Sequence, residues 1–269
     1  MGIDLTHEQT TSTAAAERWP RWRVWTIRIW YALLGVWALA MSHSVVSLAL
    51  GHAGPGERFG SGAVTAWKLL AVGGVFGIWW TGGRSVVAFQ SLVVGWVGWL
   101  GSERLYAVAP PDETPVASAI TTVILWLLPL ALLRPHRRQL LRLDLRPSAI
   151  LLPLALVAAV PLSIYAVRQG GLVTELTGPS KFYYSACGLG AVLAVQAIYA
   201  GLRPRRSRWL PQFVALAAAW IGLMAVIWPH DLTSPGRAWG GALICWALLF
   251  AAAAETETRR DPEQDRLPT

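Results

Sequence analysis

Apolar stretches about 20 residues long recur along most of the chain, and short linkers that carry arginine separate them. A helix needs about 20 mostly apolar residues to cross a bilayer, because each residue adds about 1.5 Å along its axis. By this measure the sequence predicts an all-α, polytopic transmembrane helix bundle of about eight spans. The predicted spans are 25–50, 63–82, 85–107, 117–133, 149–167, 182–201, 210–228 and 238–254.

The composition favours a membrane protein over a soluble one. Of the 269 residues, 54% are hydrophobic and only 14% are charged, whereas soluble domains carry about 25% charged residues. The same figures exclude a disordered chain, and a count of two cysteines excludes a disulfide scaffold. A net charge of +8 would indicate a nucleic-acid partner in a soluble protein. Here the basic residues lie in the linkers between apolar stretches, so no nucleic-acid partner is predicted.

The basic residues are distributed unevenly between the two sides of the predicted bundle. Lys and Arg in short loops stay on the cytoplasmic side of a membrane. If the N-terminus is inside, sixteen Lys and Arg residues fall in the inner segments and five in the outer loops. This asymmetry predicts that both termini are cytoplasmic and that the protein lies in the plasma (inner) membrane. The five outer residues are Arg58, Arg104, Arg168, Lys181 and Arg237.

The start of the chain allows two interpretations. A basic stretch, an apolar run and the small residues Ala38 and Ala40 resemble a signal peptide. The apolar run resumes as far as Leu50, so an uncleaved span is favoured, and removal of residues 1–40 stays open. The predicted regions are a polar cytoplasmic tail with an interfacial Trp/Arg anchor (1–24), a transmembrane helical domain (25–254) and a second polar cytoplasmic tail (255–269).

Ionisable and aromatic side chains gather in the outer third of the predicted spans. Charged groups inside a membrane are costly and therefore mark candidate functional sites. A rise of 1.5 Å per residue places His43 roughly 10 Å and Lys68 roughly 8 Å below the outer boundary. On the third predicted span, Trp96, Trp99 and Glu103 share one helix face, because they lie at positions i, i+3 and i+7.

These side chains predict an outward-facing recess lined by tryptophan and polar groups. Deep indoles such as Trp220 and Trp246 have two interpretations: they pack between helices and donate their N–H to a carbonyl, or they surround a ligand. Packing is favoured for them. The candidate substrate-binding residues are His43, Lys68, Trp96, Trp99, Glu103, Arg104, Tyr184, His230, Asp231 and Arg237.

The sequence predicts no metal and no cofactor. His43 and His52 are nine residues apart and would lie on opposite faces of a helix, so they cannot hold one metal ion together. No spacing resembles a zinc site or a haem attachment. Cys187 and Cys245 lie at similar predicted depth and are interpreted as packing residues rather than as a redox pair.

Small residues at helical spacing indicate where helix backbones approach each other. They favour a compact bundle and leave the oligomeric state open. The groups are Gly73 with Gly77, Gly95 with Gly98 and Gly101, Gly188 with Gly190, and Gly240 with Gly241.

Several short motifs follow one another between residues 85 and 254. They are Ala88-Phe89-Gln90, an Arg-rich linker with Leu133-Arg134-Pro135, Trp228-Pro229-His230-Asp231, Ser234, and Gly236-Arg237-Ala238-Trp239-Gly240. In this order they resemble a family of uncharacterised multi-pass membrane proteins from GC-rich bacteria. The resemblance implies a bacterial inner-membrane location and carries no activity or site residue with it.

The leading hypothesis is a binder or transporter of a small-molecule or lipid-like substrate. The chain has no phosphate-binding glycine loop, no nucleophile elbow, no zincin helix and no paired intramembrane carboxylates, so an enzyme is not favoured. A membrane-embedded enzyme that uses His43 or the His230-Asp231 pair stays as one alternative. A non-catalytic subunit or assembly factor is the other. Membrane lipids are predicted partners, and a membrane protein partner stays open.

Overall fold

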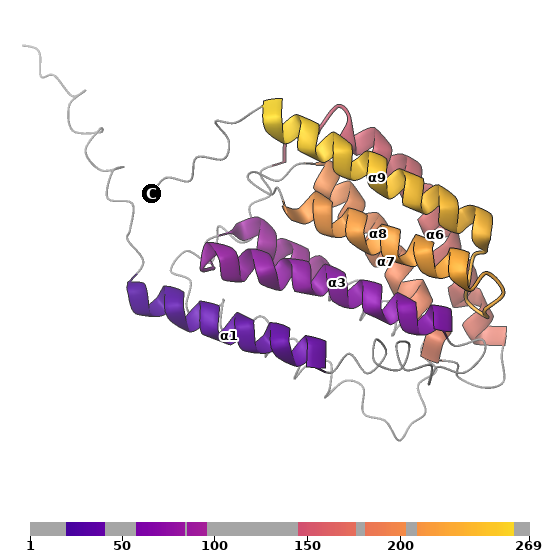
Figure 1. Cartoon of the computed structure of the whole chain (residues 1–269), viewed down its shortest axis with the longest axis horizontal. Helices are drawn as coiled ribbons and strands as arrows, with labels where there is room; N and C mark the ends of the chain where they lie inside the picture. Colours follow the sequence, from indigo (N-terminus) through magenta and orange to yellow (C-terminus); the bar gives the residue numbers. More distant parts are fainter. Residues whose placement is uncertain are drawn as a thin grey trace, which may run out of the picture.

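The computed structural model describes residues 20–40, 58–83, 85–95, 145–175, 181–202 and 209–260. Within these ranges all regular structure is helical, which confirms the predicted all-α class for the described part. The helices are α1 (Arg21–Ala40), α3 (Arg58–Thr81), α6 (Leu151–Glu175), α7 (Lys181–Gly201), α8 (Trp209–Ile227) and α9 (Arg237–Arg260), with a further helix at Val86–Gly95 (Figure 1).

Helix ends match the predicted spans in some places and extend beyond them in others. α7 and α8 agree with their predicted spans to within one residue at each end. α3 begins at Arg58 rather than at residue 63, α6 ends at Glu175 rather than at 167, and α9 ends at Arg260 rather than at 254. Hydropathy locates only the apolar part of a helix, whereas its backbone hydrogen bonds continue into polar flanks. The predicted polar tails are therefore partly helical where they join α1 and α9.

Part of the predicted bundle lies outside the described residues. This applies to the end of the first span, to residues 96–107 of the third span and to the whole fourth span, 117–133. The total of eight spans and the cytoplasmic location of both termini therefore stay predictions.

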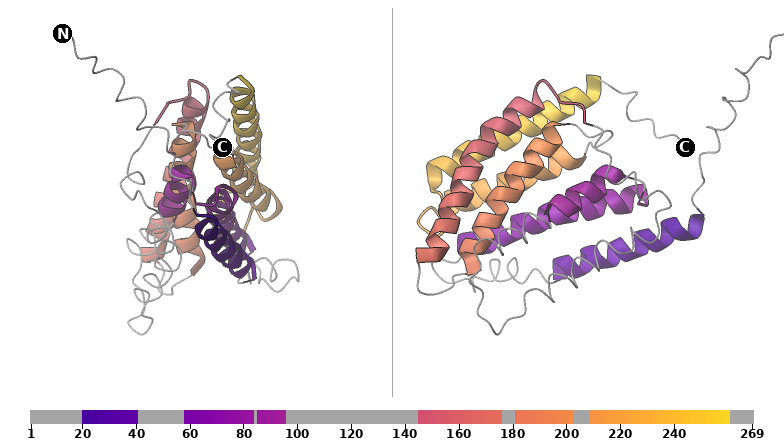
Figure 2. Two further views of the ribbon diagram at one scale, coloured as in Figure 1. Left: turned by 90° about the vertical axis from the view of Figure 1, so that its left-hand side faces the viewer. Right: turned by 180° about the vertical axis from the view of Figure 1, so that it is seen from behind.

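α3 lies at the centre of the described bundle. It packs against α1, α7 and α8, while α6 packs against α7 and α9, and α8 packs against α9. Figures 1 and 2 show α1 at one edge, beside α3, with α6 and α9 on the other side of the bundle. The apolar part of α3 is 67% buried, compared with 56% for α8 and less for α6 and α9. A side chain on α3 therefore contacts protein more often than one on the outer helices.

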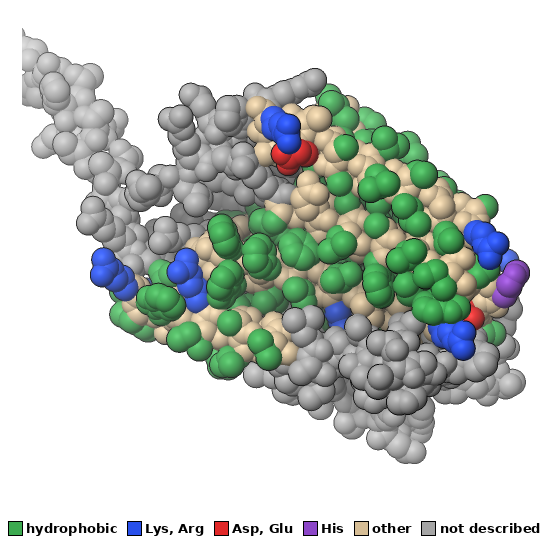
Figure 3. Space-filling model, viewed as in Figure 1, with side chains coloured by type: hydrophobic (Ala, Val, Ile, Leu, Met, Phe, Trp, Pro, Cys, Tyr) green, Lys and Arg blue, Asp and Glu red, His purple; other side chains and the backbone are tan. Residues whose placement is uncertain are grey.

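Four helices of the described part, α3, α6, α8 and α9, are long and apolar enough to cross a membrane. In the view of Figure 3, apolar side chains cover the middle of the face and most charged side chains lie toward the ends of the helices. Large apolar side chains on the outside of α6, including Val157, Val160 and Ile164, are exposed. This distribution is typical of helices surrounded by lipid.

The described bundle has two ends, which are named here after one residue each. The Asp231 end holds the start of α3, the end of α6 and the connection 228–236 between α8 and α9. The Glu257 end holds the starts of α1 and α6 and the ends of α3 and α9. The sequence predicts that the Asp231 end lies outside the cell.

A tight turn joins α3 to the next helix, at the predicted boundary between the second and third spans. Gly82 and Gly83 have φ angles of 59° and 82°, which glycine adopts without strain. The N–H of Gly83 donates to the carbonyl of Ile78 at 2.8 Å and closes the end of α3. The Ser85 hydroxyl accepts the N–H of Ala88 at 3.1 Å and caps the following helix. The two helices therefore form a helical hairpin.

The backbones of α8 and α9 approach closely at Gly222 and Gly240. A Cβ atom on either glycine would lie 2.6 Å from the backbone oxygen of the other. Close packing at Gly240 is thus confirmed, but the expectation for Gly241 is wrong, because no atom of the described residues lies within 4 Å of a Cβ there. Neighbouring positions on a helix point about 100° apart, so the two glycines cannot share one contact. Gly73 and Gly77 pack as predicted, against aromatic rings of α8.

Candidate functional site

Asp231, a predicted binding residue, caps the first turn of α3. Its Oδ2 accepts a hydrogen bond from the backbone N–H of Phe59 at 2.9 Å. The first N–H groups of a helix have no intrahelical acceptor, and a carboxylate also interacts favourably with the positive end of the helix dipole. The cap explains why α3 begins at Arg58, ahead of its apolar stretch.

The same connection is attached to α6. The Tyr165 hydroxyl donates to the carbonyl of Thr233 at 2.8 Å, and the ring of Tyr165 lies 5.6 Å from that of Trp239 between centroids. Within the connection, the N–H of Ser234 donates to the carbonyl of Asp231 at 2.9 Å. α3 and α6 therefore hold the connection from two sides.

His230 and Arg237 also lie at the Asp231 end, and both side chains are exposed. His230 belongs to the connection 228–236, and Arg237 is the first residue of α9. Long polar side chains at the end of a spanning helix reach the headgroup layer while the helix stays in the apolar region. These two residues can therefore contact a molecule that arrives from water.

Lys68 lies deeper, on the central helix. It follows Arg58, the first residue of α3, by about 15 Å along the helix axis. Its side chain is half-buried. Ser61 and Thr65 are buried on the same helix face, at i−7 and i−3, and the Thr65 hydroxyl donates to the Ser61 carbonyl at 3.0 Å. The first half of α3 thus has one polar face that ends in a lysine.

The remaining predicted site residues cannot be placed in the same way. Tyr184 lies on α7, and its side chain is outside the description. The predicted recess therefore stays a prediction, while the described part places His230, Asp231 and Arg237 at one end of the bundle and Lys68 further along α3. The site residues outside the described ranges are His43, Trp96, Trp99, Glu103 and Arg104.

Two deep indoles pack between helices, as the favoured interpretation predicts. Trp220 Nε1 donates to the carbonyl of Gly62 at 3.1 Å and links α8 to α3. Trp246 Nε1 donates to the carbonyl of Leu154 at 2.8 Å and links α9 to α6. The Trp246 ring also stacks on Phe250, with centroids 4.8 Å apart. These two tryptophans serve helix packing.

Two polar pairs join α7 to the helix Val86–Gly95, and sequence reasoning did not connect them. Gln196 donates from Nε2 to the Ser91 carbonyl at 2.6 Å, and the Ser91 hydroxyl donates to Gln196 Oε1 at 3.2 Å. The Tyr199 hydroxyl donates to Gln90 Oε1. The sequence signal for these pairs was the presence of amide side chains within apolar helices. The spacing of residues along one helix does not show which other helix packs against that face.

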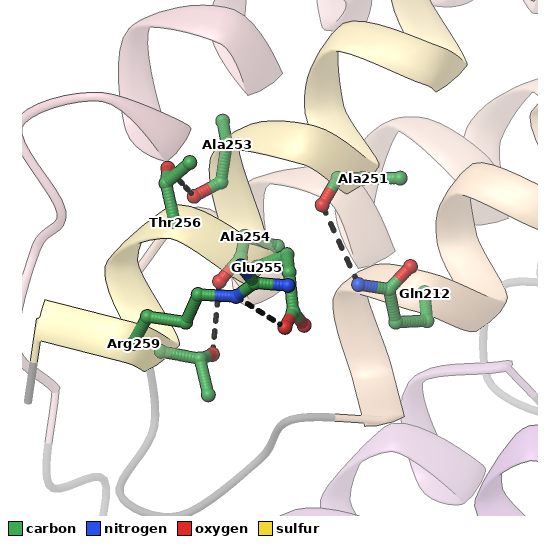
Figure 4. Close-up of polar contacts among 8 residues, drawn as sticks. Gln212, Ala251, Ala253, Ala254, Glu255, Thr256 and Arg259 are labelled. Carbon is green, nitrogen blue, oxygen red and sulfur yellow. Dashed lines mark hydrogen bonds and ion pairs between the residues drawn. The ribbon is translucent and has the colours of Figure 1, made fainter. Parts of the chain in front are cut away.

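The Glu257 end is held by a second cap. The Ser148 hydroxyl donates to Glu257 Oε1 of α9, and its oxygen accepts the N–H of Leu151 at 2.8 Å at the start of α6. On the exposed side of α9, Arg259 Nε pairs with Glu255 Oε1 at 3.0 Å (Figure 4). This pair lies within α9 and, being exposed, adds little stability, whereas the Ser148 contact joins the start of α6 to α9.

In the described ranges, no group of three or more His, Cys, Asp or Glu side chains is arranged so that it could hold a metal ion. Cys187 is buried and Cys245 is exposed, and both are free thiols. Cys187 therefore packs in the core, as predicted, whereas Cys245 faces away from it.

The chain matches no protein-family model, and comparison with curated proteins and with solved structures found no significant similarity.

Proposed function

We propose that this chain is a multi-pass protein of the bacterial plasma (inner) membrane that binds a small-molecule or lipid-like substrate from the outer side and transports it. In this proposal the bundle has about eight spans and both termini are cytoplasmic. The observation that supports it most is Lys68, a half-buried lysine on α3, the most buried of the four apolar helices.

A lysine within a spanning helix is expensive. Placing its charge at the centre of a membrane helix costs about 2.5–3.5 kcal/mol on the insertion scale, so such residues mark functional positions. Lysine is also rare in this chain, since Lys68 and Lys181 are the two examples among 23 Lys and Arg residues. A partly buried ammonium group attracts a carboxylate or phosphate more strongly than one in water does. We therefore expect the substrate to carry an anionic group.

The proposed route begins at the Asp231 end. His230 and Arg237 are exposed there and would meet the substrate at the membrane surface. The predicted aromatic face of Trp96 and Trp99 would line the way to Lys68. His43, Glu103, Arg104 and Tyr184 complete the predicted recess.

The enzyme alternative receives less support from the geometry. Asp231 Oδ2 is bound to the N–H of Phe59, so use of this carboxylate as a base would compete with the α3 cap. The third alternative, a non-catalytic subunit, requires a stoichiometric membrane partner that copurifies with the tagged full chain from gently solubilised membranes.

The two lysines provide a matched test of the binding proposal. Full-length protein is purified in detergent, and its melting midpoint is measured with fractions of a total lipid and metabolite extract from the expression host. The variants are Lys68→Met and Lys181→Met, which remove the same charge from α3 and from the start of α7. We expect at least one fraction to raise the midpoint of the wild type and of Lys181→Met, and to lose this effect in Lys68→Met.

Two results would count against the proposal. One is that no fraction raises the midpoint of the wild type. The other is that the effective fraction stabilises Lys68→Met as much as it stabilises Lys181→Met. Size-exclusion chromatography of each variant shows whether the fold is intact.

A further inference from the structure

We propose a second binding site at the Asp231 end, between α6 and the connection 228–236, in which Gln169 and Thr233 bind an uncharged ligand through its hydroxyl groups. It lies on elements other than α3 and does not depend on the role proposed for Lys68.

The starting observation is a pair of buried oxygen atoms. Gln169 is 5% exposed and Thr233 is 0% exposed. Gln169 Oε1 and Thr233 Oγ1 are both buried, and neither hydrogen-bonds to any residue that the structure describes. A buried polar atom without a partner is unfavourable, and more so in apolar surroundings. The two oxygens therefore need a partner from outside the described part of the chain.

The two residues belong to elements that one hydrogen bond joins. Tyr165 on α6 donates to the carbonyl of Thr233 at 2.8 Å. Gln169 follows Tyr165 by one helical turn, at i+4, and so lies on the same face of α6. This places the Gln169 amide beside the connection, further toward the Asp231 end.

Contacts with neighbouring elements hold the connection 228–236 in place. A ligand therefore has to enter the site to reach the Thr233 hydroxyl. Asp231 is bound to the N–H of Phe59 at 2.9 Å, and the Ser234 hydroxyl accepts the N–H of Gly236 at 3.3 Å. With Tyr165 on its other side, Thr233 is held between α3 and α6. Its side chain is 0% exposed, so its hydroxyl is shielded from bulk water in this arrangement.

The chemistry of the two groups defines the ligand class. The amide oxygen of Gln169 only accepts hydrogen bonds, whereas the Thr233 hydroxyl both donates and accepts. A ligand hydroxyl also does both, so it can donate to Gln169 and pair with Thr233 at the same time. If the amide is rotated to present its amino group, a hydroxyl still satisfies it, as an acceptor.

The surroundings disfavour a cation and favour a sugar or polyol. Among the side chains that the structure describes at this end, Arg58, Arg168 and Arg237 are positive and Asp231 is negative, so the local charge is positive. The half-buried ring of Trp239 lies against Tyr165, with centroids 5.6 Å apart. An aromatic ring of this kind offers an apolar surface to the C–H groups of a sugar or polyol. The source is either a free molecule or the headgroup of a glycolipid in the outer leaflet.

The test uses the full chain in nanodiscs of phosphatidylethanolamine and phosphatidylglycerol. One arm adds free methyl glucoside or glycerol, and the other adds monoglucosyl diacylglycerol to the nanodisc lipid. The readouts are the melting midpoint and the affinity for the effective probe. The test variants are Gln169→Leu and Thr233→Val. The controls are Gln212→Leu and Thr256→Val, which change the same residue types at exposed positions.

We expect one probe to raise the midpoint of the wild type and of both controls. Gln169→Leu and Thr233→Val should each bind that probe about tenfold more weakly, because each loses one hydrogen bond. An effect of the glycolipid alone assigns the site to a headgroup, and an effect of a free probe assigns it to a soluble molecule.

Two outcomes overturn this proposal: no probe raises the midpoint, or the two test variants respond as the controls do. Apolar replacements of similar shape at unpaired polar atoms are close to neutral, so both test variants should fold. If Thr233→Val does not, Gln169→Leu carries the test. The probe should raise the melting midpoint of Lys68→Met as much as that of the wild type. This result would separate a failure of the Gln169 and Thr233 site from a failure of the transport proposal.

Discussion

Phe59 and Asp231 stand 172 positions apart in the chain, and the backbone N–H of Phe59 donates to Asp231 Oδ2 at 2.9 Å. This hydrogen bond sets the start of the central helix α3 and holds the connection between α8 and α9 against it. Because α3 also carries Lys68, the cap anchors the helix on which the proposed binding site depends.

Removal of the cap should destabilise the protein. We expect Asp231→Ala to lower the free energy of unfolding by about 0.5–2 kcal/mol, because the first turn of α3 loses its acceptor. Asp231→Asn keeps an acceptor oxygen and should lose much less. Thermal unfolding of the full chain, followed by far-UV circular dichroism, measures both. Equal stability of Asp231→Ala and the wild type would show that the cap contributes nothing.

The contact between α8 and α9 gives a prediction with an internal control. A methyl group at Gly222 or Gly240 would lie 2.6 Å from a facing backbone oxygen, so Gly222→Ala and Gly240→Ala should each cost about 1–3 kcal/mol. Gly241→Ala meets open space and should be neutral or slightly stabilising, since alanine favours helix more than glycine does. Comparison of the three melting midpoints in one detergent tests the packing. If Gly241→Ala is the most damaging variant, the register of α9 is wrong.

The indole of Trp246 should matter for its hydrogen bond as well as for its size. Trp246→Phe loses the N–H that donates to the Leu154 carbonyl at 2.8 Å and should cost about 1 kcal/mol or more. Trp80→Phe makes the same change at a side chain that is 63% exposed and should change stability little. Chemical unfolding of both variants in mixed micelles provides the measurement. Similar losses would argue against the Trp246 contact.

The Gln196 and Ser91 pair should behave as one unit. Gln196→Leu leaves the buried polar groups of Ser91 without their partner and should cost about 1–3 kcal/mol. The double variant with Ser91→Ala should be more stable than the sum of the two single changes predicts, because an unpaired hydroxyl is removed. A double-mutant cycle on melting midpoints measures this coupling. Strict additivity would indicate that the two side chains do not interact.

Local sequence patterns predicted where the described helices lie and part of their packing. Hydropathy placed α7 and α8 to within one residue, since their apolar and helical parts coincide. The interpretation of Trp220 and Trp246 as packing residues was also correct, because a buried indole N–H needs an acceptor wherever it lies.

Contacts between distant segments were not predictable from spacing. Asp231 was predicted as a binding residue because it is an ionisable residue in a predicted outer loop, and nothing near it in the sequence indicates that it also accepts the N–H of Phe59. Gly240 was paired with its neighbour Gly241, whereas it meets Gly222 across the helix interface. In both cases the local chemistry was recognised, and the partner depends on how the helices are arranged in space.

The central claim is that Lys68 is reached from the outer side of the membrane. Its most direct test is labelling of the full-length Lys181→Met variant with a membrane-impermeant amine reagent in right-side-out and in inside-out vesicles, followed by mass spectrometry of the peptide that contains Lys68. Lys181 in Lys68→Met serves as the control, because it begins α7 and is predicted to lie on the outer side. We predict modification of Lys68 in right-side-out vesicles and protection by the stabilising extract fraction. Two results would contradict the account. One is modification of Lys68 in inside-out vesicles alone. The other is no modification of Lys68 in either kind of vesicle while the control Lys181 is modified in right-side-out vesicles.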